Sequence, residues 1–224
     1  MNESPYYEDV AKIAKLASRI SLHFRKKMFE KFLSAMQPQE DYKVLDLGVT
    51  NDDRFQESNY FEKLYPYKKN LVCAGVEDGS FLEAKYPGVH FVSVEPHKPL
   101  PFADQEFDIV FSNAVIEHVG NQADQKAFVK EMLRVSRAFF LTTPNRWFPI
   151  EFHTGWPLLH YLPKHIHRSI LSGLGKAYWS KEENLNLLSA NELQRLFPEN
   201  LRVSLSNIRL AGLVTNLIVY GSIN

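Results

Sequence analysis

From residue 43 onward, short apolar runs alternate with stretches of helical periodicity, and this alternation limits the chain to few folds. The apolar runs up to residue 144 are KVLDLG, NLVCAGVED, VHFVSV, FDIVFSNAV and RAFFLTTP. They are apolar nearly throughout, as strands are when helices cover both faces of a sheet. Strand and helix alternating at this spacing predict right-handed crossovers and a parallel, doubly wound α/β sheet.

Two long β-type runs, LRVSLSNIRLAG and LVTNLIVYGSI, close the chain. Little more than Gly212 separates them, which is too short for a parallel crossover, so they should pair as an antiparallel hairpin. The sequence therefore predicts a mostly parallel, seven-stranded sheet with a C-terminal antiparallel hairpin.

Residues 1–37 are predicted to form an N-terminal helical segment. Ser4 can cap it, Pro5 suits its first turn, and apolar side chains recur at helical spacing. These apolar residues are Val10, Ile13, Leu16, Ile20 and Phe24, and the series continues through Met28, Phe29 and Phe32. A further helix is expected over residues 121–135.

Three more helices show capping signals. Ser58 is expected to cap the helix in SNYFEKLYP. Ser80 with Glu83, and Ser189 with Glu192, have the spacing of a capping box.

The composition describes a globular chain whose 224 residues suit one domain, with residues 145–185 as an insertion. Lys plus Arg and Asp plus Glu both number 26, so no global positive field would attract nucleic acid. The single cysteine, Cys73, excludes an internal disulfide. The polar N-terminus differs from a signal peptide, and no apolar run has membrane length, so a cytoplasmic protein without stable membrane insertion is expected.

Ligands of doubly wound sheets bind at the carboxyl ends of the strands, where the strand order switches. The stretch DLGVTNDD, from residue 46, follows the first strand, and Gly48 would let backbone approach a ligand. Glu77 and Asp78 follow the second strand, and a carboxylate there can accept hydrogen bonds from both ribose hydroxyls. SNAVIEH, residues 112–118, follows the fourth strand.

Together, VLDLG, GVED, LPFADQEFDIVFSNAVIEHV and LTTPN resemble class I S-adenosylmethionine-dependent methyltransferases. More narrowly, they are similar to the small-molecule methyltransferases of bacterial metabolic and surface-glycan gene clusters. The resemblance covers roughly residues 40–145 and implies a Rossmann-like fold with S-adenosylmethionine as cofactor. The family's first motif has an aspartate and three alternating glycines, whereas this chain keeps Asp46 and Gly48 and places other residues in the rest of the loop.

The resemblance implies roles for four residues of the first loop. Asp46 would orient the loop and interact with the methionine ammonium. The backbone at Gly48, Val49 and Thr50 would pass beside the methionine and the ribose.

Five later residues have implied roles as well. Glu77 would hold the ribose diol, Asp78 would lie beside the adenine, and Glu95 would lie near the adenine amine. Asn113 and Ala114 would line the floor beneath the sulfonium. Taken singly, Glu77 could instead be a solvated strand end, Asp78 a charge at a helix start, and Asn113 a turn residue.

A dinucleotide dehydrogenase is the alternative enzyme on this fold. It needs a glycine-rich turn that lets a pyrophosphate approach a helix N-terminus. Asp52 and Asp53 would repel a pyrophosphate, whereas S-adenosylmethionine has no phosphate and carries a net positive charge. The loop therefore favours S-adenosylmethionine.

A hydroxyl acceptor benefits from a general base near its proton. The candidates are His118, Glu117, Glu151 and His153. His118 ranks first because it follows the fourth strand, where the family places its active-site loop. The alternative is that Glu117 and His118 begin a helix and serve packing or capping.

The inserted segment is expected to form the acceptor pocket, because long loops at this edge of a sheet carry specificity. Aromatic residues could stack on a sugar or aromatic ring, and basic residues could bind phosphate. Equally, the aromatic residues could cover the core or form a homodimer surface. The residues concerned are Arg146, Trp147, Phe148, Trp156, Tyr161, Lys164 and Arg168.

The same segment contains His153, His160, His165 and His167, but their spacing lacks the pattern of a zinc site, so no metal is expected. The stretch LLHYLPKHIHRSIL is mildly amphipathic and basic and could touch a membrane that carries a lipid-linked substrate.

The sequence thus favours an S-adenosylmethionine-dependent methyltransferase acting on oxygen of a small molecule or glycan intermediate. A non-catalytic binding or assembly protein with a degenerate cofactor site is the alternative, because most loop glycines are missing.

Overall fold

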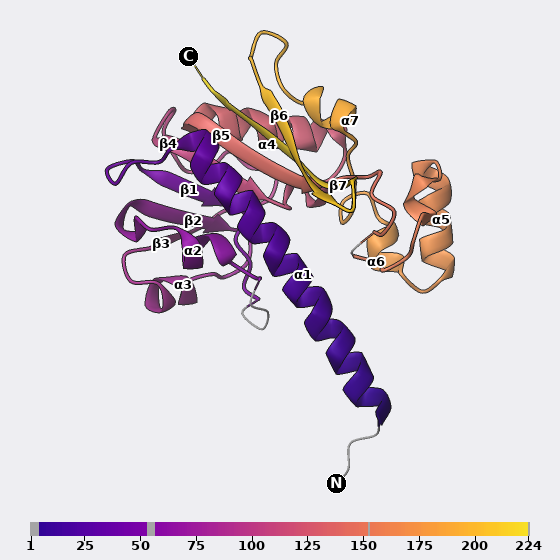
Figure 1. Cartoon of the computed structure of the whole chain (residues 1–224). Helices are drawn as coiled ribbons and strands as arrows, with labels where there is room; N and C mark the ends of the chain where they lie inside the picture. Colours follow the sequence, from indigo (N-terminus) through magenta and orange to yellow (C-terminus); the bar gives the residue numbers. More distant parts are fainter. Residues whose placement is uncertain (1–4, 53–56, 152, 224) are drawn as a thin grey trace.

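The computed structural model describes residues 5–52, 57–151 and 153–223, with side chains described from residue 19. In these ranges seven strands form one sheet in the order β3-β2-β1-β4-β5-β7-β6 (Figure 1). The strands are β1 Val44–Leu47, β2 Leu71–Gly75, β3 His90–Ser93, β4 Phe107–Asn113, β5 Ser136–Pro144, β6 Ser204–Leu210 and β7 Leu213–Ser222.

Strands β1 to β5 pair in parallel, and β7 pairs antiparallel with both β5 and β6. The turn between β6 and β7 contains only Ala211 and Gly212, both with positive φ. This topology confirms the predicted doubly wound, mostly parallel seven-stranded sheet with its C-terminal antiparallel hairpin.

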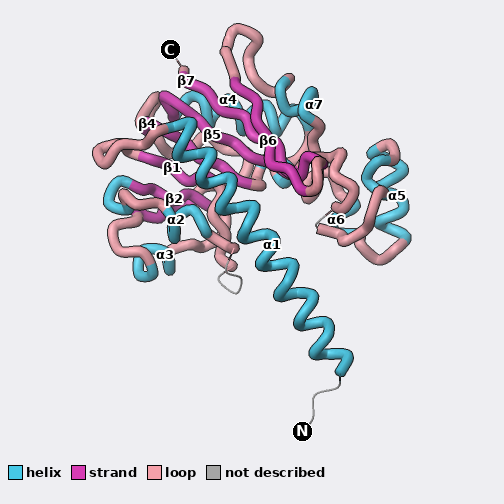
Figure 2. Tube along the Cα trace, viewed as in Figure 1, coloured by secondary structure: helices cyan, strands magenta, loops and turns pink. Residues whose placement is uncertain are grey.

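Helices lie on both sides of the sheet (Figures 1 and 2). They are α1 Pro5–Met36, α2 Tyr60–Leu64, α3 Phe81–Lys85, α4 Gln122–Val135, α5 Lys164–Gly173, α6 Ala177–Ser180 and α7 Ala190–Gln194, with 3-10 turns η1 Lys68–Asn70, η2 Ile116–His118 and η3 Leu159–Tyr161. Among the described residues, no helix combines the length and apolar character needed to cross a bilayer.

One face of the sheet is covered by α1, α2 and α3. Phe32 of α1 is fully buried at the centre of this layer, and its ring makes edge contacts with Phe61, Phe111 and Phe140 at 5.1 to 5.5 Å between centroids. Such aromatic pairs add to the free energy gained from burial. The expected N-terminal helix is confirmed over Pro5–Met36; Ser4 and the side chains of Val10, Ile13 and Leu16 lie outside the described residues.

The opposite face is covered by α4 and by the segment that contains α7. Val129, Met132 and Val135 of α4 pack against Leu45 and Val110 of the sheet. Because successive strand residues point to opposite faces, the same strands supply both layers, which explains their continuous apolar sequences.

The capping predictions had mixed outcomes. Ser189 and Glu192 form the expected capping box of α7. The prediction that Ser58 caps α2 was wrong, because Asn59 is the N-cap residue of that helix. The box of Ser80 with Glu83 was also wrong: Ser80 makes no side-chain cap, and Glu83 accepts a hydrogen bond from the backbone of β3.

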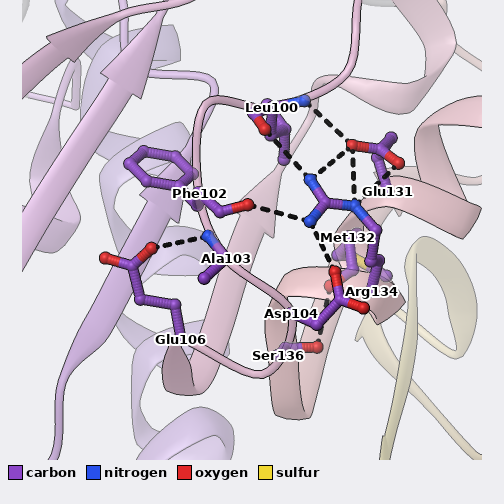
Figure 3. Close-up of polar contacts among 9 residues, drawn as sticks. All are labelled: Leu100, Phe102, Ala103, Asp104, Glu106, Glu131, Met132, Arg134 and Ser136. Carbon is purple, nitrogen blue, oxygen red and sulfur yellow. Dashed lines mark hydrogen bonds and ion pairs between the residues drawn. The ribbon is translucent and has the colours of Figure 1, made fainter.

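Arg134 of α4 fixes the segment that leads into β4 (Figure 3). Its guanidinium donates to the carbonyl oxygens of Leu100 and Phe102 at 3.0 and 2.8 Å and to Asp104 at 2.8 Å. Glu131, one turn earlier, accepts from Arg134 and from the Leu100 N–H. This network holds the backbone of residues 100–102, the segment that precedes β4.

Arg134→Met keeps the aliphatic stem and removes every donor, so two backbone carbonyls lose a charged partner. The free energy of unfolding should fall by about 2 kcal/mol, since hydrogen bonds to charged groups contribute more than neutral ones. Urea denaturation of Arg137→Met is the matched control. The Arg137 side chain is 64% exposed and pairs with Asp108 at the surface, so this substitution should lower the free energy of unfolding by less than about 1 kcal/mol. Equal losses would show that the network does not fix the segment.

Candidate functional site

Strand β1 lies between β2 and β4, so the order of the strands switches direction at the carboxyl ends of β1 and β4. Parallel pairing brings the segments after β1, β2, β4 and β5 to one edge of the sheet. Ligands of such sheets bind at this switch point. The predicted cofactor residues therefore follow strands that end side by side.

The loop after β1 needs only one glycine. Gly48 has a φ of +108°, and a Cβ there would lie 2.2 Å from a methyl group of Val115. Within residues 48–52 no other φ is positive, so Thr50 and its neighbours adopt the loop without strain. Asn59 holds the loop by donating to the Thr50 carbonyl at 2.8 Å and accepting from the Thr50 N–H at 3.1 Å.

Glu77 lies beside this loop, where it accepts hydrogen bonds from Thr50 Oγ1 at 3.4 Å and from the Asn51 N–H at 3.3 Å. Asp78 is exposed and accepts from the Ser80 N–H at 2.9 Å, and this bond lowers the pKa of Asp78. Glu77 thus lies at the first loop. Asp78 instead stabilises a local bend through its bond to the Ser80 N–H.

Glu95 follows β3 and is exposed, with Lys98 as its ion-pair partner at 2.5 Å. Val49 is buried and reaches across to the second strand, where its atoms lie against Gly75 and Gly79. The backbone of Gly48 and Val49 donates to the carbonyl oxygen of Ala74, which fixes the loop to the end of β2.

Beneath the first loop lie two buried carboxyl groups, Asp46 and Glu62. Burial raises the pKa of Asp46, and the neighbouring Glu62 raises it further. Burial also raises the pKa of Glu62 to about 7, even though the Cys73 thiol donates to it. Glu62 Oε2 has no hydrogen-bond partner within the described part of the chain. Two buried acids side by side are complementary to a cation.

The loop after β4 begins in a strained conformation. Ala114 has a φ of +55°, which costs a non-glycine residue on the order of 1 kcal/mol or more. Its N–H donates to the carbonyl oxygen of Thr142 at 2.9 Å, and the Thr142 hydroxyl donates to Asn113 at 2.6 Å. Bonds to β5 therefore hold Asn113 and Ala114 in place at the switch point.

Glu117, in η2, is completely buried at the ends of β4 and β5. One of its oxygens accepts from the Thr143 hydroxyl at 2.9 Å. The other, Oε1, has no hydrogen-bond partner among the residues that the structure describes. A buried polar atom left unpaired costs about 1–3 kcal/mol, so this oxygen marks a position where a ligand would be stabilised.

His118 and His153 face each other beside Glu117, with ring centroids 4.8 Å apart and planes at 82°. His118 Nδ1 lies 2.7 Å from the carbonyl oxygen of Asn184, which can only accept, so this nitrogen carries the proton. His153 Nδ1 lies 2.6 Å from Glu151 Oε1. The structure thus unites the two residues that the sequence proposed separately as bases.

Glu151 is the carboxylate that orients His153. It also accepts from the backbone N–H groups of His153 and Thr154 and from the Thr154 hydroxyl, at 2.6 to 2.7 Å. Burial opposes ionisation, but these hydrogen bonds and the charge of the His153 ring lower the pKa of Glu151 to about 2. Burial tends to lower the pKa of His153. The hydrogen bond and charge of Glu151, together with the charge of Glu117, outweigh burial, so the pKa of His153 is raised.

The proposed acceptor residues lie in the segment after β5. Trp147 and Trp156 are 50% and 44% exposed. Tyr161 contacts the Trp147 ring at 5.4 Å and donates to the Trp147 carbonyl. Arg146 stacks on Trp147 and donates to the Leu162 carbonyl.

A small, partly open hollow lies between this segment and residues 185–187. Its basic residues already have acidic partners: Glu192 lies within 3.6 Å of Arg146 and 3.3 Å of Lys164, and Glu182 lies 2.9 Å from Arg168. The hollow is lined by Arg146, His160, Lys164, His167, Arg168, Leu185, Asn186 and Leu187.

Sequence reasoning missed four residues that shape the site. Glu62 is the one that carried a signal, as an acidic residue among the apolar residues of YFEKLYP. Asn59, Thr143 and Asn184 act through backbone bonds or hidden contacts that no local pattern indicates.

Comparison with known proteins agrees with this geometry. Residues 61–138 match the family model of a methyltransferase domain. The match spans α2 to the start of β5 and includes Glu77, Asn113 and His118, while the loop after β1 precedes it. No curated protein sequence matches the chain.

Solved structures share the fold at low sequence identity. The chain is similar to the S-adenosylmethionine-dependent methyltransferase of Methanosarcina mazei, with 16% identity, 82% and 92% of the two chains covered and a TM-score of 0.52. It is also similar to the S-adenosylmethionine-dependent methyltransferase of Mesorhizobium loti, with 15% identity, 84% of this chain and 94% of the other covered, and a TM-score of 0.53. The YcgJ protein of Bacillus subtilis is 17% identical, with 80% of this chain and 70% of the other covered and a TM-score of 0.53. The chain therefore has the Rossmann-like methyltransferase fold.

The buried acid pair predicts an unusual pH dependence of stability. Because the folded-state pKa of Glu62 is about 7 against an ordinary 4.5, the folded state binds more protons between these values. The free energy of unfolding should therefore fall as pH rises from about 4.5 to about 7. Glu62→Gln should remove this loss and exceed the wild type at pH 8 by on the order of 1–3 kcal/mol.

Urea denaturation of both proteins at pH 4.5 and pH 8 measures this difference. A constant difference between the two proteins at both pH values would contradict an ionisable, buried Glu62.

Proposed function

We propose that this chain is an S-adenosylmethionine-dependent methyltransferase that acts on oxygen of a small molecule or a glycan intermediate. The observation that carries the proposal is the acidic site at the switch point, whose carboxyl groups would repel a phosphate. Asp46 and Glu62 are buried beneath the first loop, and Glu77 lies beside it. The methyltransferase match and the fold support the same conclusion.

The residues present fit S-adenosylmethionine by charge. Its methionine ammonium would neutralise the buried pair of Asp46 and Glu62. Glu77 would accept hydrogen bonds from the ribose hydroxyls in exchange for its weak contacts to Thr50 and Asn51. Gly48, Asn113 and Ala114 would supply the backbone surface.

When bound, S-adenosylmethionine supplies a methyl group that an acceptor oxygen displaces in line from the sulfonium. The chain's part is to position that oxygen and to receive its proton. Glu117 and His118 follow Asn113 and Ala114 in the sequence, and His153 joins them at the same edge from the segment after β5. The Nε2 atoms of the two histidines are the positions where the acceptor hydroxyl would bind.

The acceptor itself is expected to contact the exposed aromatic side chains of Trp147, Trp156 and Tyr161. Flat rings of this kind stack on sugars and on other aromatic groups. Arg146 is less available for a phosphate, because Glu192 and the Leu162 carbonyl already hold it. We therefore favour an uncharged acceptor moiety, and homodimer formation and a cytoplasmic location stay predictions.

A non-catalytic binding or assembly protein is the second candidate function. It is favoured by the contacts of Glu77 with Thr50 and Asn51, which occupy the carboxylate that the ribose would need. The two candidates differ in whether the chain binds the cofactor and turns it over.

Isothermal titration calorimetry with S-adenosylhomocysteine tests the proposal. The wild type should bind, and Glu77→Ala should weaken binding by more than ten-fold, or about 1.4 kcal/mol, because a charged hydrogen-bond acceptor is lost. Glu40→Ala is the matched control: Glu40 is exposed and precedes β1, at the opposite edge of the sheet, so its affinity should match the wild type. If the wild type gives neither heat nor a thermal shift, the enzyme proposal is wrong.

The affinity for S-adenosylhomocysteine should also depend on pH. A ligand ammonium beside Asp46 binds best when Glu62 is ionised, so affinity should rise between pH 6 and pH 8, across the Glu62 pKa of about 7. In Glu62→Gln the rise should be lost. A wild-type affinity that is flat with pH, or a rise retained by Glu62→Gln, would show that the ammonium binds elsewhere.

A further inference from the structure

We propose that Glu117, His118 and His153 bind one divalent transition-metal cation. Each residue offers one ligand atom, and these atoms all lie within 4.8 Å of one another. Glu117 and His118 come from η2 after β4, and His153 comes from the segment after β5. The site therefore forms only when the sheet brings these two segments together.

The two imidazoles are oriented as metal ligands are. Each Nδ1–H is held by an acceptor: the Asn184 carbonyl oxygen for His118, and the Glu151 carboxylate for His153. Each Nε2 is then the nitrogen with the free lone pair. Metal-binding histidines commonly donate their other N–H to a carboxylate or a backbone carbonyl, which fixes the ring and its tautomer.

Glu117 supplies an independent observation. Its side chain is 0% exposed, and its Oε1 has no hydrogen-bond partner in the described part of the chain. Thr143 binds the other oxygen and so fixes the carboxyl group, with Oε1 4.0 Å from His118 Nε2. A cation at this point would satisfy a buried oxygen that the protein leaves unpaired.

The distances require only a small inward movement. Ligand atoms bound tetrahedrally at about 2.1 Å lie roughly 3.4 Å apart, whereas the three ligand atoms here lie within 4.8 Å of one another, with 4.0 Å between Glu117 Oε1 and His118 Nε2. Side-chain rotation in His118 and His153, which are 32% and 20% exposed, can close this gap. Two imidazoles and one carboxylate suit zinc, manganese, iron, cobalt or nickel and leave coordination positions open.

The prediction that no metal binds was based on the sequence spacing of His153, His160, His165 and His167. In the fold, His160 instead approaches His167, with ring centroids 6.5 Å apart, and binds the Phe148 carbonyl. The partners of His153 come from the segment after β4, and sequence spacing alone does not bring them together.

One consequence rests on the proposed function. An acceptor hydroxyl bound to the cation would lose its proton to solvent more easily. In the metal-bound protein the histidines would therefore act as ligands, and solvent would replace them as the proton acceptor of the proposed function. The acceptor oxygen would then form the new bond to the methyl carbon while the bond from carbon to sulfur breaks and sulfur keeps the electron pair. Metal binding itself does not depend on this step.

Titration of the tag-free, chelator-treated protein with Zn²⁺, followed by calorimetry, tests the site directly, and Co²⁺ absorption reports the ligand geometry. We expect one ion per chain. His118→Ala and His153→Ala should each weaken binding at least 100-fold, and Glu151→Gln, which retains all three ligands, about 10- to 100-fold. His165→Ala is the matched control, because His165 is an exposed histidine of α5.

Wild-type binding below 0.1 ion per chain would overturn the proposal, as would equal losses in His118→Ala and His165→Ala. Circular dichroism of each metal-free variant verifies folding, and Glu117→Gln provides a second, near-isosteric test that should weaken Zn²⁺ binding at least 10-fold. S-adenosylhomocysteine titration of the same samples separates the two proposals. Loss of cofactor binding with intact Zn²⁺ binding would contradict only the proposed function, and the reverse only the metal site.

Discussion

The parallel pairing of β1 with β4 is the constraint on which the rest of the site depends. Asp46 lies directly opposite Phe111 in this pairing, so the loops that begin at Gly48 and Ala114 leave the sheet side by side. Val115 then packs against Gly48 so closely that a Cβ at residue 48 would collide with it. A change in either loop would therefore displace the other. Interlocking of this kind fixes the conformation of the first loop with a single glycine.

The site concentrates buried acidic groups that weaken the folded state. Asp46 and Glu62 share one cluster beneath the first loop, and Glu117 leaves an oxygen unpaired after β4. Structural carboxylates usually have partners, as Glu151 does with four short hydrogen bonds. Under the metal-site proposal, this contrast assigns Glu151 to positioning His153 and Glu117 to binding the cation. Cations, a methionine ammonium at one cluster and a metal ion at the other, would offset the cost of both.

Sequence reasoning recovered the sheet because continuous apolar strands and the short turn at Gly212 leave few alternatives. It also placed Glu77, Asn113 and His118 at one edge, since the carboxyl ends of parallel strands meet there. It failed where a partner is distant in the chain: Glu83 binds β3 and not Ser80, because its side chain meets the Phe91 backbone only after folding. Thr143 was missed for the same reason, since its partner Glu117 lies 26 residues earlier in the chain. The grouping of His153 with Glu117 and His118 depends on a crossover of about 35 residues that carries no local signal.

The most direct test of the central claim is a crystal structure of the chain with S-adenosylhomocysteine. The account predicts the ligand across the carboxyl ends of β1, β2 and β4, with its ribose hydroxyls at Glu77 and its ammonium toward Asp46 and Glu62. Its sulfur should point toward the side of the site formed by Glu117, His118 and His153. Ligand density anywhere else on the chain, or Glu77 still bound to Thr50 beside a bound ribose, would contradict the account.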